Sequence, residues 1–257
     1  MPTAAQLYRS NNPSLVGSEI IPAQNSLLVG GCTTAQIANC VDQFYATRTF
    51  MPRAANNNTG TDVSGNALAL TRTSMTTSNV STQDPYAWVF NGTTSYFNVA
   101  SPVNATVFAT GDLTFEAWIL VNSFVSTNGI FDCRAAAASS PTGVYVSLAP
   151  TTGYLGITSN NITTSAAVAP TLGTYTHIAV VRQGGYFSGY QNGVQVIAPY
   201  SYPGTLTDGT LSIGASYAAA NIFGSGAAAS MSGIRISKAA LYTEPFAPPT
   251  TPFPAIA

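Results

Sequence analysis

The amino-acid sequence predicts an all-β fold of antiparallel strands joined by tight turns. The clearest evidence is the stretch Thr174–Val194. Apolar residues occupy both alternating sets of positions over Ile178–Val181, which is typical of a strand covered on both faces. Gly184-Gly185 and Asn192-Gly193 are turn signals, because glycine adopts a positive φ angle at little steric cost. We therefore expect two successive hairpins in this stretch.

Two earlier stretches also predict strands. Trp88–Val99 has two alternating runs around Asn91-Gly92, which predicts a hairpin. In Gly111–Ile119 the alternation separates two faces. One face carries Leu113, Phe115, Ala117 and Ile119, and the other carries Thr114, Glu116 and Trp118. Further strands are expected at residues 129–133, 144–148, 154–157 and 211–214.

The first 60 residues differ from the rest. Leu27–Val29 suits a short strand or an apolar plug, and a helix is expected over residues 34–47, capped by Thr33 or Thr34. Its apolar stripe contains Ile37, Cys40, Val41, Phe44 and Tyr45. Two partners remain open for this stripe, the chain's own β domain or a neighbouring subunit. A polar linker at Asn56–Gly60 then predicts an arm over residues 1–60 and a β domain over 61–257.

The composition limits the classes of partner. Charged residues make up 7% of the 257 residues, against roughly 25% in an ordinary soluble domain. Such a surface suits packing within an assembly, although a β protein rich in Thr, Ser, Ala and Gly would show the same composition. The net charge of −1 argues against a nucleic-acid partner, which needs a clustered basic face. No run reaches ~18 apolar residues, so no membrane span is expected.

The N-terminus lacks a basic start followed by an apolar core, so no secretion signal is expected. The three cysteines are Cys32, Cys40 and Cys133. They form no Cys-x-x-Cys metal motif. Cys32 and Cys40 could pair, but free thiols are the expectation for a protein made in a cytoplasm.

These patterns occur in an order that resembles the concanavalin A-like (laminin-G-like) lectin/glucanase domains. The hallmark strand and turns of that family match Tyr175, Thr176, His177, Ile178–Val181, Arg182, Gly184 and Asn192-Gly193, with Tyr175 where the family often has Trp. Gly111–Ile119, Asp62–Asn66, Phe90, Gly92, Tyr96 and Leu211–Gly214 match further pieces. The resemblance covers about residues 61–253. It implies a jelly-roll sandwich of two antiparallel sheets.

The chain's end resembles the laminin-G-like domains of bacteriophage virion proteins. The matching residues are Met231–Tyr242, followed by Pro248, Pro249, Pro252 and Phe253. The resemblance implies an extended, proline-rich tail lying over the edge of the sandwich.

No enzymatic activity is expected. Glycan-cleaving relatives carry paired carboxylates on one strand, and here Glu116 is followed at i+2 by Trp118. His177, the single histidine, is expected to be structural and bonded to backbone. No cofactor is expected, with calcium as an open alternative suggested by the resemblance. Its ligand candidates are Asp112, Asp132 and Asp208, which would otherwise cap turns.

Several residues suggest binding surfaces. Tyr186, Tyr190 and Asn192 are candidates for a glycan site, and Ile37, Val41, Phe44 and Tyr45 are candidates for an assembly interface. Tyr200, Tyr202, Tyr217 and Asn128 belong to the same aromatic and amide-rich set.

We expect a non-enzymatic structural protein of a phage particle, made in the host cytoplasm and located in the virion. A capsid decoration or a head or tail appendage, anchored by its arm to other virion proteins and forming a homo-oligomer such as a trimer, is one hypothesis. The alternative is a tail-fibre or receptor-binding adhesin that recognises host surface glycan. A secreted carbohydrate-binding domain is a third hypothesis, against which the missing signal counts.

Overall fold

The computed structural model describes residues 19–20, 28–29, 48–66, 68–79, 83–99, 108–134, 143–159, 162–202, 204–206 and 211–253. The chain divides into two units, Met1–Thr47 and Arg48–Ala257. In the first unit, β1 (Glu19–Ile20) pairs antiparallel with β2 (Leu28–Val29). Strand β2 lies within Leu27–Val29, for which the sequence predicts a short strand or an apolar plug. The expected helix and its stripe (Ile37, Val41, Phe44 and Tyr45) lie outside the described residues, as do Cys32 and Cys40.

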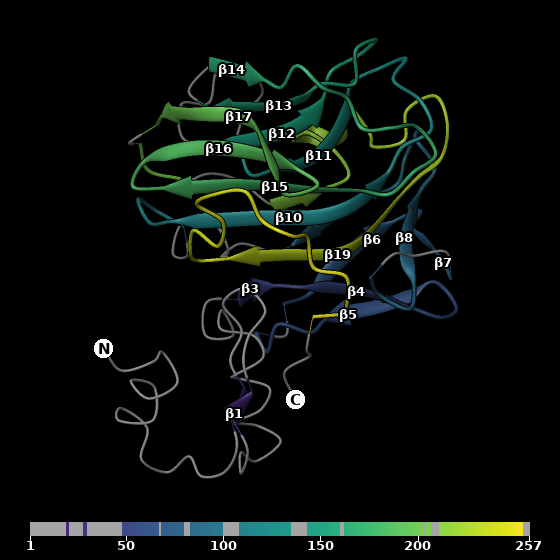
Figure 1. Cartoon of the computed structure of the whole chain (residues 1–257). Coiled ribbons are helices and arrows are strands. Elements are labelled where there is room, and N and C mark those ends of the chain that lie inside the picture. Colours follow the sequence, from purple (N-terminus) through teal and green to yellow (C-terminus); the bar gives the residue numbers. More distant parts are fainter. Residues whose placement is uncertain are drawn as a thin grey trace. The chain divides into compact units, whose positions relative to one another are not determined.

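The second unit is a sandwich of two antiparallel sheets, which confirms the predicted all-β fold (Figure 1). The first sheet runs in the order β17 (Val194–Ser201), β16 (Tyr186–Gln191), β15 (Thr176–Gln183), β10 (Leu113–Leu120), β19 (Ala229–Ser237), β8 (Ala87–Phe90) and β7 (Thr76–Ser78). The short strand β3 (Arg48–Phe50) also pairs with β19.

The second sheet runs in the order β14 (Ile162–Ser165), β13 (Leu155–Ser159), β12 (Val144–Leu148), β11 (Asn128–Asp132), β18 (Leu211–Ile213), β9 (Tyr96–Val99) and β6 (Leu70–Thr73). Beside the two sheets, β4 (Pro52–Ala55) and β5 (Thr59–Asp62) form a hairpin. A short 3₁₀ turn, η2 (Tyr217–Ala219), follows β18.

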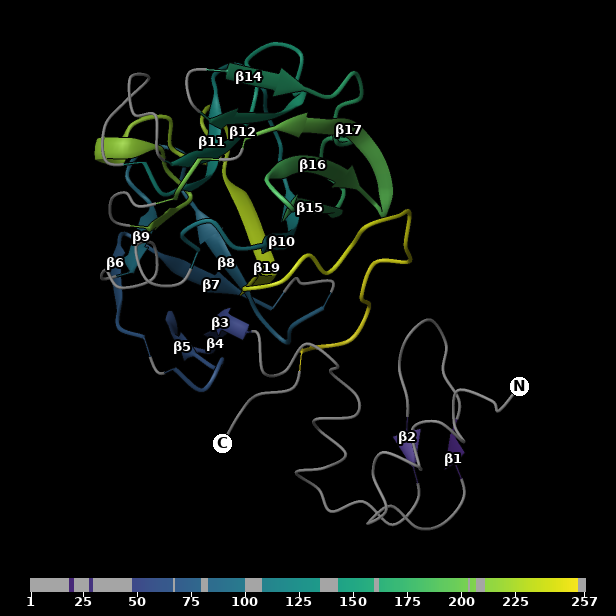
Figure 2. The same ribbon diagram turned by 90° about the vertical axis from the view of Figure 1, so that its left-hand side faces the viewer.

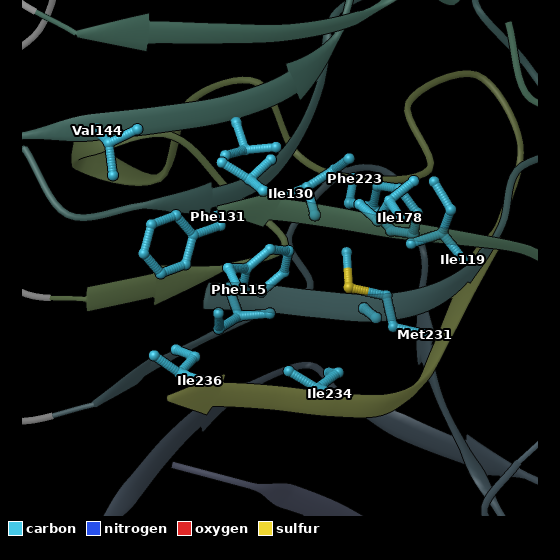
Figure 3. Close-up of a cluster of buried hydrophobic side chains, with 14 of the residues drawn as sticks. Phe115, Ile119, Ile130, Phe131, Val144, Ile178, Phe223, Met231, Ile234 and Ile236 are labelled. Atoms are coloured by element: carbon cyan, nitrogen blue, oxygen red, sulfur yellow. The ribbon is translucent and has the colours of Figure 1, made fainter. Parts of the chain in front are cut away.

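The hydrophobic core lies between the sheets, where the inward side chains of each strand meet. The rings of Phe115 on β10 and Phe131 on β11 are 4.8 Å apart, and Figure 3 shows them among buried Ile, Val, Met and Phe side chains. Each fully buried side chain of this size contributes roughly 1.5–3 kcal/mol relative to exposure. The predicted faces of β10 are therefore correct, with Phe115 directed inward and Glu116 directed to the opposite side.

The expected hairpins around β16 are present. Gly184 and Gly185, with φ angles of 54° and 84°, join β15 to β16. Asn192 and Gly193, with φ angles of 47° and 77°, join β16 to β17. Positive φ at both turn residues matches the right-handed twist of the paired strands.

The hairpin predicted for Trp88–Val99 is wrong, because β8 and β9 belong to opposite sheets. The side chain of Asn91 folds the connection: its Oδ1 accepts hydrogen bonds from the backbone amides of Thr93, Thr94 and Ser95 at 3.0, 2.9 and 3.0 Å. A Cβ atom on Gly92 would lie 1.9 Å from the carbonyl oxygen of Gly224. Asn91-Gly92 therefore begins the loop that connects the two sheets, and this loop packs closely against the loop that contains Gly224.

The compact β unit begins at Arg48, which differs from the expected boundary after residue 60. The expected linker Asn56–Gly60 is instead the turn region between β4 and β5, with Asn57 and Asn58 at φ angles of 57° and 58°. Asparagine tolerates this conformation better than other non-glycine residues, so a run of asparagines serves a tight turn as well as a linker.

Residues 239–253, which we call the C-terminal strap, follow β19. The strap crosses the outer face of the first sheet, where Ala240, Tyr242 and Phe246 pack on Ala179, Val181 and Tyr190 (Figures 1 and 2). The sequence predicts that the proline-rich tail within it lies over the edge of the sandwich, but Pro249 accepts a hydrogen bond from Trp118 of the central strand β10. The cover by the strap explains why β15 is buried on both faces, as its sequence predicts.

Candidate functional site

A shallow groove of about 370 Å³ lies on the outer face of the first sheet. Strands β15, β16 and β17 form its base, and the C-terminal strap forms one wall. Its lining residues are Val181, Gln183, Gly184, Tyr186, Ser188, Tyr190, Gln195, Pro199, Tyr242 and Thr243.

The strand register brings the base of the groove together. Gln183 stands opposite Tyr186, and Val181 stands opposite Ser188, across the β15–β16 pair. Tyr190 stands opposite Gln195 across the β16–β17 pair. Because side chains alternate between the faces of a sheet, Tyr186, Ser188 and Tyr190 share the outer face of β16. The intervening Phe187 points into the core.

The lining combines aromatic rings with uncharged polar groups. Tyr186 is 51% exposed, whereas Tyr190 is 2% exposed and packs against Phe246 of the strap with ring centroids 5.5 Å apart. Gln183 and Gln195 provide amide donors and acceptors, and Ser188 and Thr243 provide hydroxyls, while the lining residues include no Asp, Glu, His, Lys or Arg. The tyrosine rings of such a groove can stack on a flat apolar face of a ligand. The amides and hydroxyls around them can form hydrogen bonds with hydroxyl groups of the same ligand.

The wall residue Tyr242 belongs to a buried polar cluster beneath the strap. The other members of this cluster are Glu116, His177 and Arg235. The Tyr242 hydroxyl donates to Oε2 of Glu116 at 2.7 Å. The guanidinium of Arg235 donates to Oε1 of Glu116 at 2.7 Å, and Nε2 of His177 lies 3.1 Å from Oε2. Glu116 and His177 are both fully buried. The expectation of a structural histidine bonded to backbone is wrong in its partner, because the His177 ring contacts a carboxylate.

The cluster shifts the pKa values of its members. Burial by itself would raise the pKa of Glu116, but the positive charge of Arg235 and the hydrogen bonds from His177 and Tyr242 outweigh it and lower the pKa to about 2. Burial and the neighbouring Glu116 carboxylate raise the pKa of Tyr242. Glu116 is therefore a carboxylate and Tyr242 a neutral donor near neutral pH.

The strap has further contacts. The rings of Tyr242 and Phe246 stack with their centroids 3.6 Å apart, and the amide of Phe246 donates to the carbonyl of Gly193 at 3.0 Å. The indole Nε1 of Trp118 donates to the carbonyl of Pro249 at 3.0 Å. At the far end, the guanidinium of Arg235 lies 3.8 Å above the ring of Phe253.

Of the predicted glycan residues, Tyr186 and Tyr190 line the groove and Asn192 does not. Asn192 is a turn residue whose Oδ1 accepts from the amide of His177 at 2.9 Å. The sequence analysis missed the groove residues Ser188 and Tyr242. Ser188 could have been found, because alternation along β16 places it on the face shared by Tyr186 and Tyr190. No sequence pattern predicts Tyr242, because its position depends on how the strap folds back.

The calcium candidates do not come together. Asp112 accepts from the amide of Gly184 at 2.9 Å, and Asp132 is buried in an ion pair with Arg134 at 2.7 Å. Asp208 lies outside the described residues. In the part of the chain that the structure describes, no three His, Cys, Asp or Glu side chains form a group that could hold a metal ion. Within the same residues, no helix is long and apolar enough to cross a membrane.

Solved structures share this fold at low sequence identity. One is botulinum neurotoxin type C, whose cell entry depends on interaction with two ganglioside molecules (12% identity, TM-score 0.58, covering 77% of this chain and 49% of that one). Another is the binding domain of Paraclostridial Mosquitocidal Protein 1 (14% identity, TM-score 0.61, covering 77% of this chain and 50% of that one). A third is the binding domain of botulinum neurotoxin DC in complex with SialylT (10% identity, TM-score 0.59, covering 77% of this chain and 49% of that one).

The chain thus spans about half the length of these structures, and at such identities the likeness shows the fold alone. No curated protein matches the sequence. The family model of the concanavalin A-like lectin/glucanases superfamily matches residues 91–244. That match includes the groove strands β15, β16 and β17, and it includes all four members of the cluster, Glu116, His177, Arg235 and Tyr242. The chain therefore belongs to the concanavalin A-like lectin/glucanase superfamily.

Proposed function

We propose that this protein is a non-enzymatic adhesin module that binds a neutral surface saccharide in the groove on β15, β16 and β17. The supporting observation is the composition of the groove, in which the half-exposed Tyr186 ring is surrounded by amides and hydroxyls. The π face of tyrosine is electronegative and suits the C–H face of a sugar ring. Amides and hydroxyls can bond to the sugar hydroxyls, and a few such polar groups fix orientation in binding sites.

The charges near the groove favour a neutral ligand. Asp112 accepts from Gly184 at the rim, and Glu244 follows the lining residue Thr243. Both carboxylates would repel a sialic acid or a sulfated sugar, and the lining residues offer no arginine or lysine to compensate.

The positions of the side-chain carboxylates support a protein that binds the saccharide and does not hydrolyse it. Glycoside hydrolysis uses two carboxylates flanking the scissile bond. The lining residues of the groove include no carboxylate, and Glu116 beneath the strap is fully buried and bonded to Arg235.

The test is calorimetric titration of the protein with lactose, maltotriose and chitotriose, and with sialyllactose as the anionic comparison. Binding of at least one neutral sugar, its loss in Tyr186→Ala and its retention in Tyr217→Ala would support the proposal. Tyr217 is a suitable control because it is also a well-exposed tyrosine, located on η2 away from the groove residues. Preference for sialyllactose, or unchanged binding by Tyr186→Ala, would contradict it.

A virion setting is part of the proposal. It is supported by the resemblance of Pro248, Pro249, Pro252 and Phe253 to the tails of phage laminin-G-like domains, and by the scarcity of charged residues.

A second function, capsid decoration or appendage, is favoured by the separate unit Met1–Thr47, which could act as an anchor. Deleting residues 1–47 should then abolish incorporation into particles and leave a folded sandwich. Unchanged incorporation would exclude an anchoring arm.

A further inference from the structure

The groove is built from two parts of the chain. Three neighbouring strands provide its base, and Tyr242 and Thr243 of the C-terminal strap provide a wall. We propose that the strap is an integral part of the saccharide site and that Glu116 is a positioning residue acting on the ligand through Tyr242. This inference rests on the proposed function and adds a residue that does not itself line the groove.

The outer face of β10 holds the strap at three successive positions. Thr114 donates through Oγ1 to the carbonyl of Ala239 at 2.7 Å and accepts from the amide of Leu241 at 2.9 Å. Glu116 accepts from the Tyr242 hydroxyl, and Trp118 donates to the carbonyl of Pro249. A single β-strand therefore fixes the beginning, the wall residue and the later part of the strap.

The contact between Glu116 and Tyr242 is the one that fixes the wall. A hydrogen bond between a hydroxyl and a carboxylate is stronger than one between neutral groups, and burial keeps water from competing with it. Glu116 is in turn fixed by Arg235, so the acceptor cannot rotate away without breaking a buried ion pair. The hydroxyl end of Tyr242 is thus anchored below the sheet surface while part of the residue lines the groove.

The stacking of Tyr242 on Phe246 connects this restraint to the floor of the groove. Phe246 also contacts the ring of Tyr190, the buried floor residue. The three rings of Tyr242, Phe246 and Tyr190 form a continuous support beneath and beside the bound sugar. A wall that is already ordered loses little conformational entropy on binding, which favours affinity.

The test compares Tyr242→Phe, which keeps the ring and its stacking but removes the hydroxyl, with Thr114→Val, which loosens the strap without touching the groove. Tyr217→Phe is the matched control for loss of a tyrosine hydroxyl. Two readouts are needed: the affinity for the best neutral sugar among lactose, maltotriose and chitotriose, and amide hydrogen exchange across residues 239–253.

We expect Tyr242→Phe to weaken binding about tenfold, which corresponds to about 1.4 kcal/mol, and to accelerate exchange in the strap. Thr114→Val should accelerate exchange and weaken binding in the same direction, while Tyr217→Phe should leave both unchanged. A single cooperative melting transition for Tyr242→Phe and for Thr114→Val would show that the sandwich remains folded in both variants.

The outcomes separate this inference from the proposed function. If Tyr186→Ala abolishes binding while Tyr242→Phe and Thr114→Val bind like the native protein, the groove assignment holds and the role of the strap is overturned. If the native protein binds none of the neutral sugars, or if none of the three variants changes binding, the groove assignment itself is overturned.

Discussion

The carboxylate of Glu116 and the hydroxyl of Tyr242 lie 2.7 Å apart although 126 positions separate them in the sequence. This contact joins a central strand of the first sheet to the C-terminal strap. Because Arg235 and His177 reach the same carboxylate, the cluster links β10, β15, β19 and the strap in one buried network. Networks of this kind are costly to break at any single member.

The first prediction concerns acid. The pKa of Glu116 is about 2 in the folded protein, below its ordinary value of 4.5. A carboxyl group with a lowered pKa stabilises the fold above its unfolded pKa and loses that contribution as the pH falls through the folded pKa. We therefore expect roughly 3 kcal/mol of the free energy of unfolding to disappear between about pH 4.5 and pH 2, at about 1.36 kcal/mol per pKa unit.

The control for this prediction is Glu116→Gln, measured by urea unfolding at each pH. The variant should be less stable than the native protein near neutral pH, and the gap should narrow as the pH falls. Burial raises the pKa of Asp84, so its titration acts in the opposite sense, but Asp84 is present in both proteins and cancels in the comparison. A gap that stays constant down to pH 2 would show that the carboxylate is not stabilised by its neighbours.

The second prediction compares two turn glycines that both have positive φ. A Cβ atom on Gly184 would meet no atom within 4 Å, whereas one on Gly193 would lie 1.7 Å from the carbonyl oxygen of Phe246. Gly184→Ala should therefore cost only the backbone strain, about 1 kcal/mol. Gly193→Ala should cost more and should also displace the strap.

Thermal melting would measure the cost, and limited proteolysis would report the release of the strap. Equal loss of stability in the two variants, with no cleavage within residues 239–253, would mean that the strap does not press against the β16–β17 turn.

The third prediction concerns Arg182, whose fully buried guanidinium donates to the carbonyls of Ala109, Gly111, Tyr202 and Gly204. An ammonium group cannot reproduce the planar fork that serves two separate backbone segments. We expect Arg182→Lys to lower the free energy of unfolding by about 3 kcal/mol, because several buried carbonyls lose a charged donor.

The matched substitution is Arg72→Lys, since Arg72 is exposed and donates to the carbonyl of Asn58. Its effect should stay within about 0.5 kcal/mol, as for other surface changes. Similar urea-unfolding curves for the two lysine variants would rule out a structural role for the Arg182 fork.

The fourth prediction tests the contact between the sheets. Phe131→Ala removes the ring that packs on Phe115 and should cost about 3–5 kcal/mol, because the sandwich closes only partly over the cavity. Val194→Ala, at a residue that is 60% exposed, should have little effect in the same unfolding measurement. A loss below about 1 kcal/mol for Phe131→Ala would be inconsistent with a tightly packed core.

The sequence by itself determined the elements that depend on local physics. Alternation assigned the two faces of β10, and the glycine-containing turns defined the hairpins around β16. The aromatic content of the return strand suggested Tyr186 and Tyr190 as candidates, and both line the groove. These features could be predicted because a strand's period of two and a glycine's positive φ are properties of a few adjacent residues.

Only the tertiary structure decided how those elements combine. Asn91-Gly92 looks like a hairpin turn, yet the loop bends between sheets because Gly92 lies against Gly224, which is distant in sequence. Tyr242 enters the groove because Glu116 lies beneath it, and no local pattern encodes a contact across 126 positions. Such contacts depend on which surfaces the folded sheets leave exposed, so the wall of the groove emerges only when the strap folds back across them.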